Sequence, residues 1–493
     1  MTAPSSRRPR ILSAAEAAGD WDLIVIGAGS AGLVASRTAA SLGARTLLIE
    51  AARFGGECLY TGCVPSKALI AAAHTAHTAR TASRLGVDVE GVTVDFARVM
   101  AHVRASIAHI EPVDAPEALV AKGVFVLTGH ARLTGSTELV VDGHRLRFRD
   151  AVIAAGSHPV TPDVPGAADL PILTNETFWD LDEQPESLLV QGGGPIGCEL
   201  AQAMARLGTR VTLVHRGERI LPREDAAASR LVHDALVRDG VDVRVKTTVT
   251  ALTPAGSSGA GTARLSDGKD VAFDRMLAAI GRRAATAGLG LDAAGVRLTP
   301  DGDVEVDRTL RTSNPRIRAA GDVTALPRFT HTAGFFASTA ATNAVLGLSR
   351  TVDVAAVPRV TFTAPEVGAI GVAPVDAQAK GLRVVTKEHD DVDRAVADHD
   401  TAGHTTLVID RRGRLQGASV VGPRAGEVLG ELTTAVAAGL NVRALASTIH
   451  AYPTYADAAW NAAIGAAQEG LDRGIVGRGI RFLRRRHARR TAL

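Results

Sequence analysis

Two cysteines lie close together near the start of the chain, and their spacing permits redox chemistry. Cys58 and Cys63 are separated by four residues in the segment GGECLYTGCVPSK, residues 55–67. Two thiols this close can reach disulfide geometry if the first turn of the predicted helix is distorted, and a helix N-terminus lowers the pKa of a thiol. A zinc site is the rival interpretation, but the third cysteine is Cys198 and no His-rich segment lies nearby. Two inert buried thiols are the remaining alternative.

A glycine motif precedes the cysteine segment. Gly27, Gly29 and Gly32 form a GxGxxG pattern between a predicted strand at 22–26 and a predicted helix. The glycines let the backbone turn tightly and approach a pyrophosphate, which sits at the helix N-terminus. Glu50 ends the next predicted strand, where a carboxylate can accept hydrogen bonds from a ribose hydroxyl. The pattern predicts a dinucleotide site, and a glycine-rich turn without a ligand is the alternative.

The same pattern recurs about 165 residues later. Gly192, Gly194 and Gly197 lie between strands predicted at 187–191 and 209–214. Two such βαβ units at this separation predict two nucleotide-binding domains and exclude a solenoid with a short repeat.

In combination, these motifs resemble the class I pyridine nucleotide-disulfide oxidoreductases, which include dihydrolipoamide dehydrogenase, glutathione reductase and mercuric reductase. The family carries GGxCxxxGCxPSK after an FAD-binding GxGxxG. Three further segments are similar to family motifs: IAAGS at 153–157, AAGD at 319–322 and FTAPEVGAIG at 362–371. The resemblance covers residues 22–470, nearly the whole chain.

The resemblance implies roles for individual residues. Cys58 and Cys63 would form a redox-active disulfide, with Cys58 toward the substrate and Cys63 toward the flavin. Lys67 and Glu199 would form an ion pair beside the reactive flavin nitrogen, where a fixed cation stabilises the negative charge that arrives with hydride. The cofactor contacts predicted in total are Gly27, Gly29, Gly32, Glu50, Lys67, Gly156, Asp322 (on the ribityl chain), His331, Gly192, Gly194, Gly197, His215, Arg216, Arg219 and Gly281.

The choice of nicotinamide cofactor depends on the residues after the strand at 209–214. NADH-specific relatives have an acid there, whereas this chain has His215, Arg216 and Arg219. Cations suit a 2′-phosphate, so NADPH is favoured and NADH remains an alternative. Glu218 opposes this interpretation, and a solvated loop would explain the same residues.

The chain departs from the family near its C-terminus. Disulfide-reducing relatives carry HxHPxxxE, in which the second His is the acid/base and the Glu orients it. Here Tyr452 takes the place of that His and Asp457 the place of the Glu. A phenol with a pKa of about 10 is a poor proton shuttle at neutral pH. Mercuric reductases also have Tyr there, but their C-terminal Cys pair is missing from this chain. His450 is a substitute base in one interpretation and a structural residue in the favoured one.

The predicted fold class is α/β: two Rossmann-like dinucleotide-binding domains, for FAD and NAD(P), plus a C-terminal α+β dimerisation domain. A homodimer follows, because the Tyr452 segment would complete the partner's site. The predicted boundaries are a disordered tail at 1–20, the FAD domain at 21–160 and 284–352, the NAD(P) domain at 161–283, the dimerisation domain at 353–473 and a basic tail at 474–493.

Composition excludes several classes of function. Aromatic residues make up 3% and the net charge is +3, which argues against a nucleic-acid partner. Three cysteines in 493 residues exclude a secreted disulfide framework. No apolar run reaches the roughly 18 residues of a membrane span, so we expect the cytoplasm. Seven arginines between Arg478 and Arg490 would permit contact with an acidic membrane surface, the lesser alternative.

The predicted function is transfer of electrons from NADPH, through FAD and the Cys58–Cys63 disulfide, to an acceptor such as a metal ion, a quinone or an oxidant. No resident metal site is expected. Dihydrolipoamide dehydrogenase, or another reductase of small disulfides, is the alternative within the family. A non-catalytic, surface-associated flavoprotein scaffold is the alternative of another class.

Overall fold

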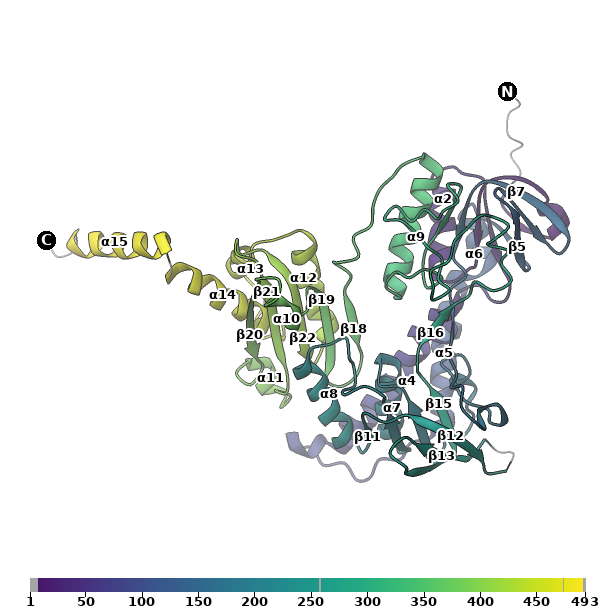
Figure 1. Ribbon diagram of the computed structural model, residues 1–493. Coiled ribbons are helices and arrows are strands. Elements are labelled where there is room, and N and C mark those ends of the chain that lie inside the picture. Colours follow the sequence, from purple (N-terminus) through teal and green to yellow (C-terminus); the bar gives the residue numbers. More distant parts are fainter. Residues whose placement is uncertain (1–7, 257–258, 473, 491–493) are drawn as a thin grey trace. The chain divides into compact units, whose positions relative to one another are not determined.

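The computed structural model describes residues 8–256, 259–472 and 474–490 (Figure 1). The chain forms two compact units. The first holds residues 1–79, 91–216 and 246–354, and the second holds 80–90, 217–245 and 355–493. Among the described residues, no helix is both long enough and apolar enough to cross a membrane.

An eight-stranded sheet dominates the first unit. Its strands run in the order β1-β4-β3-β2-β7-β6-β5, and β17 pairs with β7. The neighbouring strands β1, β4, β3, β2 and β7 are parallel to one another. The strands β7, β6 and β5 form an antiparallel meander. The bounds are β1 Ile11–Leu12, β2 Gly19–Ile26, β3 Thr46–Glu50, β4 Phe125–Thr128, β5 Ala131–Gly135, β6 Glu138–Val141, β7 His144–Ile153 and β17 Ile317–Ala319.

Helices from distant parts of the sequence accompany this sheet. The helix after the first glycine motif, α2, lies beside α9, which follows β17 (Figure 1). This places the start of α9 near the redox segment. The bounds are α1 Ala14–Ala17, α2 Ser30–Ser41, α3 Gly56–Tyr60, α4 Cys63–Arg80, α5 Phe96–Asp114, α6 Pro116–Ala121 and α9 Thr330–Leu346.

The second glycine motif belongs to another parallel sheet of the first unit, in which β10, β9 and β15 are neighbours. An antiparallel sheet, β12-β13-β14, and a two-stranded pair, β8 with β16, complete the unit. The bounds are β8 Ser157–Pro159, β9 Ser187–Gln191, α7 Pro195–Leu207, β10 Arg210–Val214, β12 Val249–Pro254, β13 Gly261–Leu265, β14 Asp270–Phe273, β15 Arg275–Ala278 and β16 Arg282–Ala284, with 3-10 turns at Ala167–Asp169 and Phe178–Asp180.

The second unit is built on a five-stranded antiparallel sheet in the order β18-β19-β22-β21-β20. Helices α12 and α14 share an apolar core with it, for example Leu429 and Ala462 against Leu407. The bounds are a 3-10 turn at Ala82–Leu85, α8 Ala226–Arg238, β11 Asp242–Arg244, β18 Arg359–Thr361, β19 Glu366–Gly371, α10 Pro374–Ala377, β20 Arg383–Glu388, α11 Asp393–Ala397, β21 His404–Ile409, β22 Leu415–Gly422, α12 Ala425–Ala437, α13 Val442–Ser447, α14 Asp457–Asp472 and α15 Gly474–Arg490.

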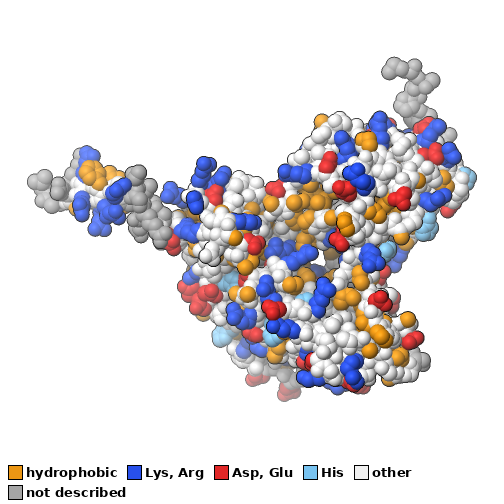
Figure 2. All heavy atoms as spheres, viewed as in Figure 1, with side chains coloured by type: hydrophobic (Ala, Val, Ile, Leu, Met, Phe, Trp, Pro, Cys, Tyr) orange, Lys and Arg blue, Asp and Glu red, His pale blue; other side chains and the backbone are white. Residues whose placement is uncertain are grey.

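Both ends of the chain differ from the sequence prediction. Residues 1–7 lie outside the described residues, but the rest of the predicted disordered tail is ordered. Ile11 and Leu12 pair with β4, and Ser13 and Glu16 cap α1 reciprocally. Most of the predicted loose basic tail is the helix α15, on which arginine and hydrophobic side chains lie exposed next to one another (Figure 2).

Candidate active site

The two cysteines of the redox segment lie on two successive helices. Cys58 is in the short helix α3 and Cys63 begins α4. Both are thiols in this structure and are hydrogen-bonded to one another. The backbone of Gly56 has φ +62° and lies so close to the first glycine motif that a Cβ there would come within 2.4 Å of the Gly29 Cα. Glycine at position 56 therefore lets the thiol pair lie directly beside the predicted pyrophosphate site.

The two thiols differ in acidity. A hydrogen bond from Cys58, with further help from the Thr330 hydroxyl and the Lys67 charge, lowers the pKa of Cys63 to about 6. The Cys63 Sγ lies 3.1 Å from the Thr330 Oγ1. The hydrogen bond to Cys63 and burial raise the pKa of Cys58. At neutral pH the reduced pair therefore holds a Cys63 thiolate and a Cys58 thiol.

This asymmetry predicts how the reduced protein reacts with iodoacetamide. Only thiolates are alkylated, so the fast reaction at Cys63 should rise with pH around a midpoint near 6 and fall away below it. Lys67→Met should raise that midpoint, whereas Lys67→Arg, which keeps the charge, should leave it low. Rate profiles with peptide mapping by mass spectrometry would check this. A single midpoint near the ordinary thiol pKa for both cysteines would contradict it.

Cys58 also faces a pocket of about 240 Å³. Its wall is mostly apolar, with Leu33, Val34 and Val64 among its lining residues. Its charged lining groups are Arg37 and Asp114, which form an ion pair with 2.9 Å between Nη2 and Oδ1. A small molecule in this pocket would therefore lie beside the Cys58 sulfur. The substrate-side role of Cys58 stays a prediction.

The ion pair predicted between Lys67 and Glu199 is present. The Lys67 Nζ lies 2.8 Å from the Glu199 Oε2, and the Glu199 side chain is only 7% exposed. The two residues come from α4 and α7, so the pair connects the redox segment to the helix after the second glycine motif. A buried carboxylate holds the ammonium group in one place, as a fixed cation requires.

The first glycine motif fits a dinucleotide. A Cβ on Gly32 would lie 1.7 Å from the Gly27 carbonyl oxygen, and one on Gly27 would lie 2.4 Å from that of Ala154. The loop can therefore adopt this close path only with glycine. Glu50 ends β3, and its carboxylate accepts hydrogen bonds from the Ala28 and Ala52 backbone N–H groups at 2.6 and 2.8 Å. A fixed carboxylate beside the loop suits the ribose of FAD.

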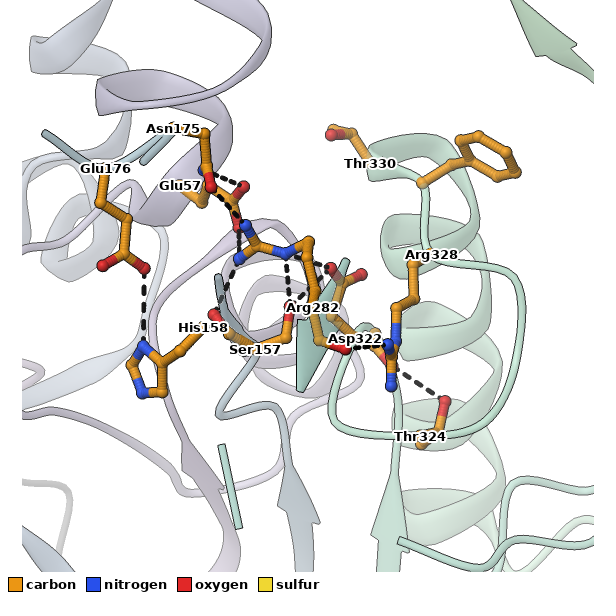
Figure 3. Close-up of polar contacts among 12 residues, drawn as sticks. Glu57, Ser157, His158, Asn175, Glu176, Arg282, Asp322, Thr324, Arg328 and Thr330 are labelled. Carbon is orange, nitrogen blue, oxygen red and sulfur yellow. Dashed lines mark hydrogen bonds and ion pairs between the residues drawn. The ribbon is translucent and has the colours of Figure 1, made fainter. Parts of the chain in front are cut away.

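A guanidinium group that the sequence analysis did not single out lies at the centre of the site (Figure 3). Arg282 is 13% exposed and forms an ion pair with Glu57. It also donates hydrogen bonds to the Ser157 Oγ at 2.8 Å and the Asn175 Oδ1 at 2.9 Å. Burial raises the pKa of Glu57 to about 7, although the Arg282 charge opposes that shift. Only the position of Glu57 within the cysteine motif, and of Arg282 directly after Gly281, could have drawn attention to them.

The other residues predicted near FAD are distributed around this cluster. The Asp322 Oδ2 accepts a hydrogen bond from the Ser157 Oγ at 3.0 Å and lies 3.8 Å from the Arg282 Nε. Gly156 and Gly281 have φ values of +76° and +133°, which favour glycine. His331 is exposed at the start of α9, where its ring stacks on Phe329.

The second glycine motif repeats the geometry of the first. A Cβ on Gly197 would lie 1.8 Å from the Gly192 carbonyl oxygen, and Gly194 is the N-cap of α7. The His215 Nδ1 accepts a hydrogen bond from the Gly193 N–H at 3.2 Å, so this ring nitrogen carries no proton. His215 therefore contacts the loop as a neutral ring here, and the Arg216 side chain next to it in the sequence is exposed.

Arg219 lies in the second unit, in the segment before α8. Its guanidinium donates hydrogen bonds to the backbone carbonyls of Pro222 and Glu224 at 3.2 and 3.1 Å, which hold it in the loop. The side chain is exposed.

The residues predicted to replace the family's His–Glu pair also belong to the second unit. Tyr452 is 68% exposed, and its hydroxyl donates a hydrogen bond to Asp393. This bond raises the pKa of Tyr452. Asp457 is buried at the start of α14, where its Oδ2 accepts a hydrogen bond from the Thr454 N–H at 3.1 Å. Asp393, rather than Asp457, therefore orients the Tyr452 hydroxyl.

Both ring nitrogens of His450 lie within hydrogen-bonding distance of an oxygen atom. Its Nε2 lies 2.8 Å from the Glu431 Oε1 and its Nδ1 lies 2.9 Å from the Thr448 carbonyl oxygen. The ring also stacks on Trp460. Because both nitrogens face oxygen atoms, neither offers a free lone pair to a substrate proton. The geometry supports the structural interpretation of His450.

Comparison with known proteins decides the family. The domain described as "Pyridine nucleotide-disulphide oxidoreductase" matches residues 21–337, and the dimerisation domain of the same family matches residues 357–463. The chain belongs to the pyridine nucleotide-disulphide oxidoreductase family. Membership of this family confirms the predicted fold class. It also confirms the prediction that the protein is an oxidoreductase of the disulfide type that uses FAD and a pyridine nucleotide. The predicted domain boundaries stay predictions.

Several relatives match along almost their whole length. The chain is 36% identical over 448 residues to a mercuric reductase from Streptomyces lividans, with 89% of this chain and 94% of the relative covered. It is 34% identical over 460 residues to a dihydrolipoyl dehydrogenase from Geobacillus stearothermophilus, with 90% and 96% covered. A solved Cu(II) complex of the HOCl-induced flavoprotein disulfide reductase RclA from Escherichia coli has a TM-score of 0.80 and 26% identity, with 90% and 99% covered.

Proposed function

We propose that this family member delivers electrons from NADPH to a soft metal ion, a quinone or another direct oxidant, and is a poor reductase of small disulfides. One observation carries the proposal: Tyr452 stands where disulfide-reducing relatives have a histidine, and its hydroxyl is bound to Asp393, which raises its pKa. A group that holds its proton this firmly is unsuited to protonate a leaving thiolate near pH 7. The similarity to a mercuric reductase supports a metal acceptor.

The residues of the site have different proposed roles in electron transfer. When bound, FAD supplies the two-electron chemistry that takes hydride from a nicotinamide. Lys67, held by Glu199, offers a fixed positive charge next to the thiol pair. The Cys58 thiol lines the apolar pocket, where it would meet an acceptor, and the exposed Cys63 carries the thiolate. When the pair gives two electrons to an acceptor, the two sulfurs form one S–S bond and the Cys58 proton is released.

An acceptor screen tests the proposal. The FAD-loaded protein should oxidise NADPH measurably with Hg²⁺, Cu²⁺ or a benzoquinone, and only weakly with lipoamide or glutathione disulfide. Turnover of lipoamide at rates typical of dedicated reductases, on the order of 10–10³ per second, would overturn the proposal and assign the chain to the dihydrolipoyl dehydrogenase activity of other relatives.

We also propose that NADPH is preferred to NADH, with Arg216 and Arg219 each a candidate contact for the 2′-phosphate. A charge-assisted contact of this kind is worth more than about 1.5 kcal/mol, or roughly tenfold in affinity. Replacing both arginines with alanine should remove the preference, while Arg210→Ala, an exposed arginine at the start of β10, should keep it. Rates of flavin reduction at matched low concentrations of each nucleotide measure the effect. Equal rates for the native protein would refute it.

A homodimer is the proposed assembly. The dimerisation domain of the family matches residues 357–463, which include Tyr452 and Asp457. Sedimentation equilibrium of the native protein should give a mass close to twice 51.0 kDa. A monomer at micromolar concentration would contradict this assembly.

A further inference from the structure

We propose that Glu57, together with Arg282 and Asn175, is a positioning residue that fixes the redox helix α3 relative to the flavin-binding residues. The inference rests on the proposed function in one respect, namely that Cys58 and Cys63 are the redox pair. Glu57 directly precedes Cys58 in the sequence. Contacts that hold the Glu57 side chain therefore also restrict the backbone next to the reactive sulfur.

Three side chains form a closed cycle at this point (Figure 3). The Glu57 Oε1 accepts a hydrogen bond from the Asn175 Nδ2 at 2.9 Å, and the Glu57 Oε2 accepts one from the Arg282 Nη2. The Asn175 Oδ1 in turn accepts one from the Arg282 Nη1 at 2.9 Å. Each member contacts the other two, which is a geometry that holds the carboxylate in one orientation.

The same segment also holds the other end of the redox helix. Trp179 lies four residues after Asn175, and its Nε1 donates to the Thr61 carbonyl oxygen at 3.0 Å and to the Asn175 carbonyl oxygen at 2.7 Å. Thr61 is the C-cap of α3. The residues 175–179 therefore hold α3 at Glu57 near its start and at Thr61 at its end, and Cys58 lies between these two contacts.

Asn175 and Arg282 are both connected through the backbone to the sheet that carries the second glycine motif. The Leu173 N–H donates to the Met276 carbonyl and the Ala278 N–H donates to the Leu173 carbonyl, each at 2.8 Å, so this segment joins β15. Arg282 lies on β16, four residues after the end of β15. A displacement of that sheet would therefore move both hydrogen-bond partners of the Glu57 carboxylate, Asn175 and Arg282.

Arg282 also connects the cycle to the predicted flavin contact. Its Nε donates to the Ser157 Oγ at 2.8 Å, and that hydroxyl donates to the Asp322 Oδ2 at 3.0 Å. The path Glu57–Arg282–Ser157–Asp322 therefore runs from the residue next to Cys58 to the residue expected on the ribityl chain. We therefore expect a change at Glu57 or Arg282 to alter the position of the Cys58 sulfur relative to Asp322.

The test compares Glu57→Ala and Glu57→Gln with Glu176→Gln in the FAD-loaded protein. Glu176 is a carboxylate of the same turn that pairs with His158 at 3.5 Å and takes no part in the cycle. Glu57→Ala should remove the ion pair on the Nη2 side of the buried Arg282 guanidinium and leave it only the more distant Asp322, 3.8 Å from its Nε. Glu57→Gln removes the charge but keeps one acceptor oxygen, so it should give an intermediate effect.

Two readouts are needed. Anaerobic stopped-flow with NADPH should show the thiolate–flavin charge-transfer absorbance appearing roughly tenfold to hundredfold more slowly in Glu57→Ala, because a misplacement of about 1 Å can cost this much. Flavin bleaching, the preceding phase, should change little. Equilibration of the thiol pair with dithiothreitol buffers should shift in the same variants and stay at the native value in Glu176→Gln.

If Glu57→Ala loses its FAD, Arg282→Lys supplies the same test, because it keeps the charge and loses the two-pronged contact. The inference is overturned if both Glu57 variants, or Arg282→Lys, retain native charge-transfer kinetics and the native dithiothreitol equilibrium within about twofold. Failure of the proposed function would look different: the native protein itself would take up no electrons in its thiol pair.

Discussion

Replacing Cys63 with serine is expected to abolish the thiolate–flavin charge-transfer absorbance and to lower turnover with a metal or quinone acceptor by about 10³-fold or more, since the disulfide can no longer form and the two sulfurs act as a unit. Cys63 is the thiolate of the pair because Cys58, Thr330 and Lys67 all lower its pKa. Cys58→Ser should also lose turnover but keep the absorbance, because the Cys63 thiolate remains.

Cys198→Ala is the matched control. This cysteine is fully buried in α7, and burial raises its pKa, so it does not ionise near neutral pH. The variant should keep native turnover and spectra. Full turnover in Cys63→Ser would show that the acceptor draws electrons without the thiol pair.

The second large effect concerns Tyr452. A positioned acid accelerates proton-coupled steps by roughly 10²–10⁴-fold, so Tyr452→His should raise turnover with lipoamide or glutathione disulfide, by up to this factor if the pocket admits the substrate. Asp457 is buried and bound to the Thr454 backbone, which leaves the new imidazole poorly oriented. Tyr452→His with Asp457→Glu should therefore gain more than the single variant.

Tyr452→Phe separates the acid/base question from packing. It removes the hydroxyl that donates to Asp393 and should leave disulfide turnover as low as in the native protein. Steady-state NADPH oxidation with each acceptor measures all three variants. A native protein that reduces lipoamide rapidly, and loses this activity in Tyr452→Phe, would show that the phenol acts as the acid.

Local sequence patterns were enough to predict the parts of the site that depend on backbone geometry. The strand–glycine–helix units around Gly27 and Gly192 require glycine for steric reasons that are visible in the structure. The turn at Asp142 and Gly143 has φ values of +48° and +79°, the positive values that an Asp–Gly pair favours in a tight hairpin turn. The Lys67–Glu199 ion pair followed from the family resemblance and is present.

The contacts that the sequence analysis missed join residues far apart in the chain. Arg282 is 225 positions from Glu57, and Thr330 is 267 positions from Cys63. No periodicity or motif encodes such pairs, because they exist only after the parallel strands bring their connections to one edge of the sheet. The ordered segment at Ile11 was missed for a similar reason: two apolar residues become a strand only because β4 offers a free edge.

The central claim is that Cys58 and Cys63 store two electrons in addition to those held by FAD. Anaerobic titration of the FAD-loaded protein, with absorbance recorded after each addition of reductant, measures this directly. We expect uptake of about four electrons per subunit, two in the flavin and two in the disulfide, with charge-transfer absorbance after the first two. Uptake of only two electrons, with no such absorbance, would contradict the account.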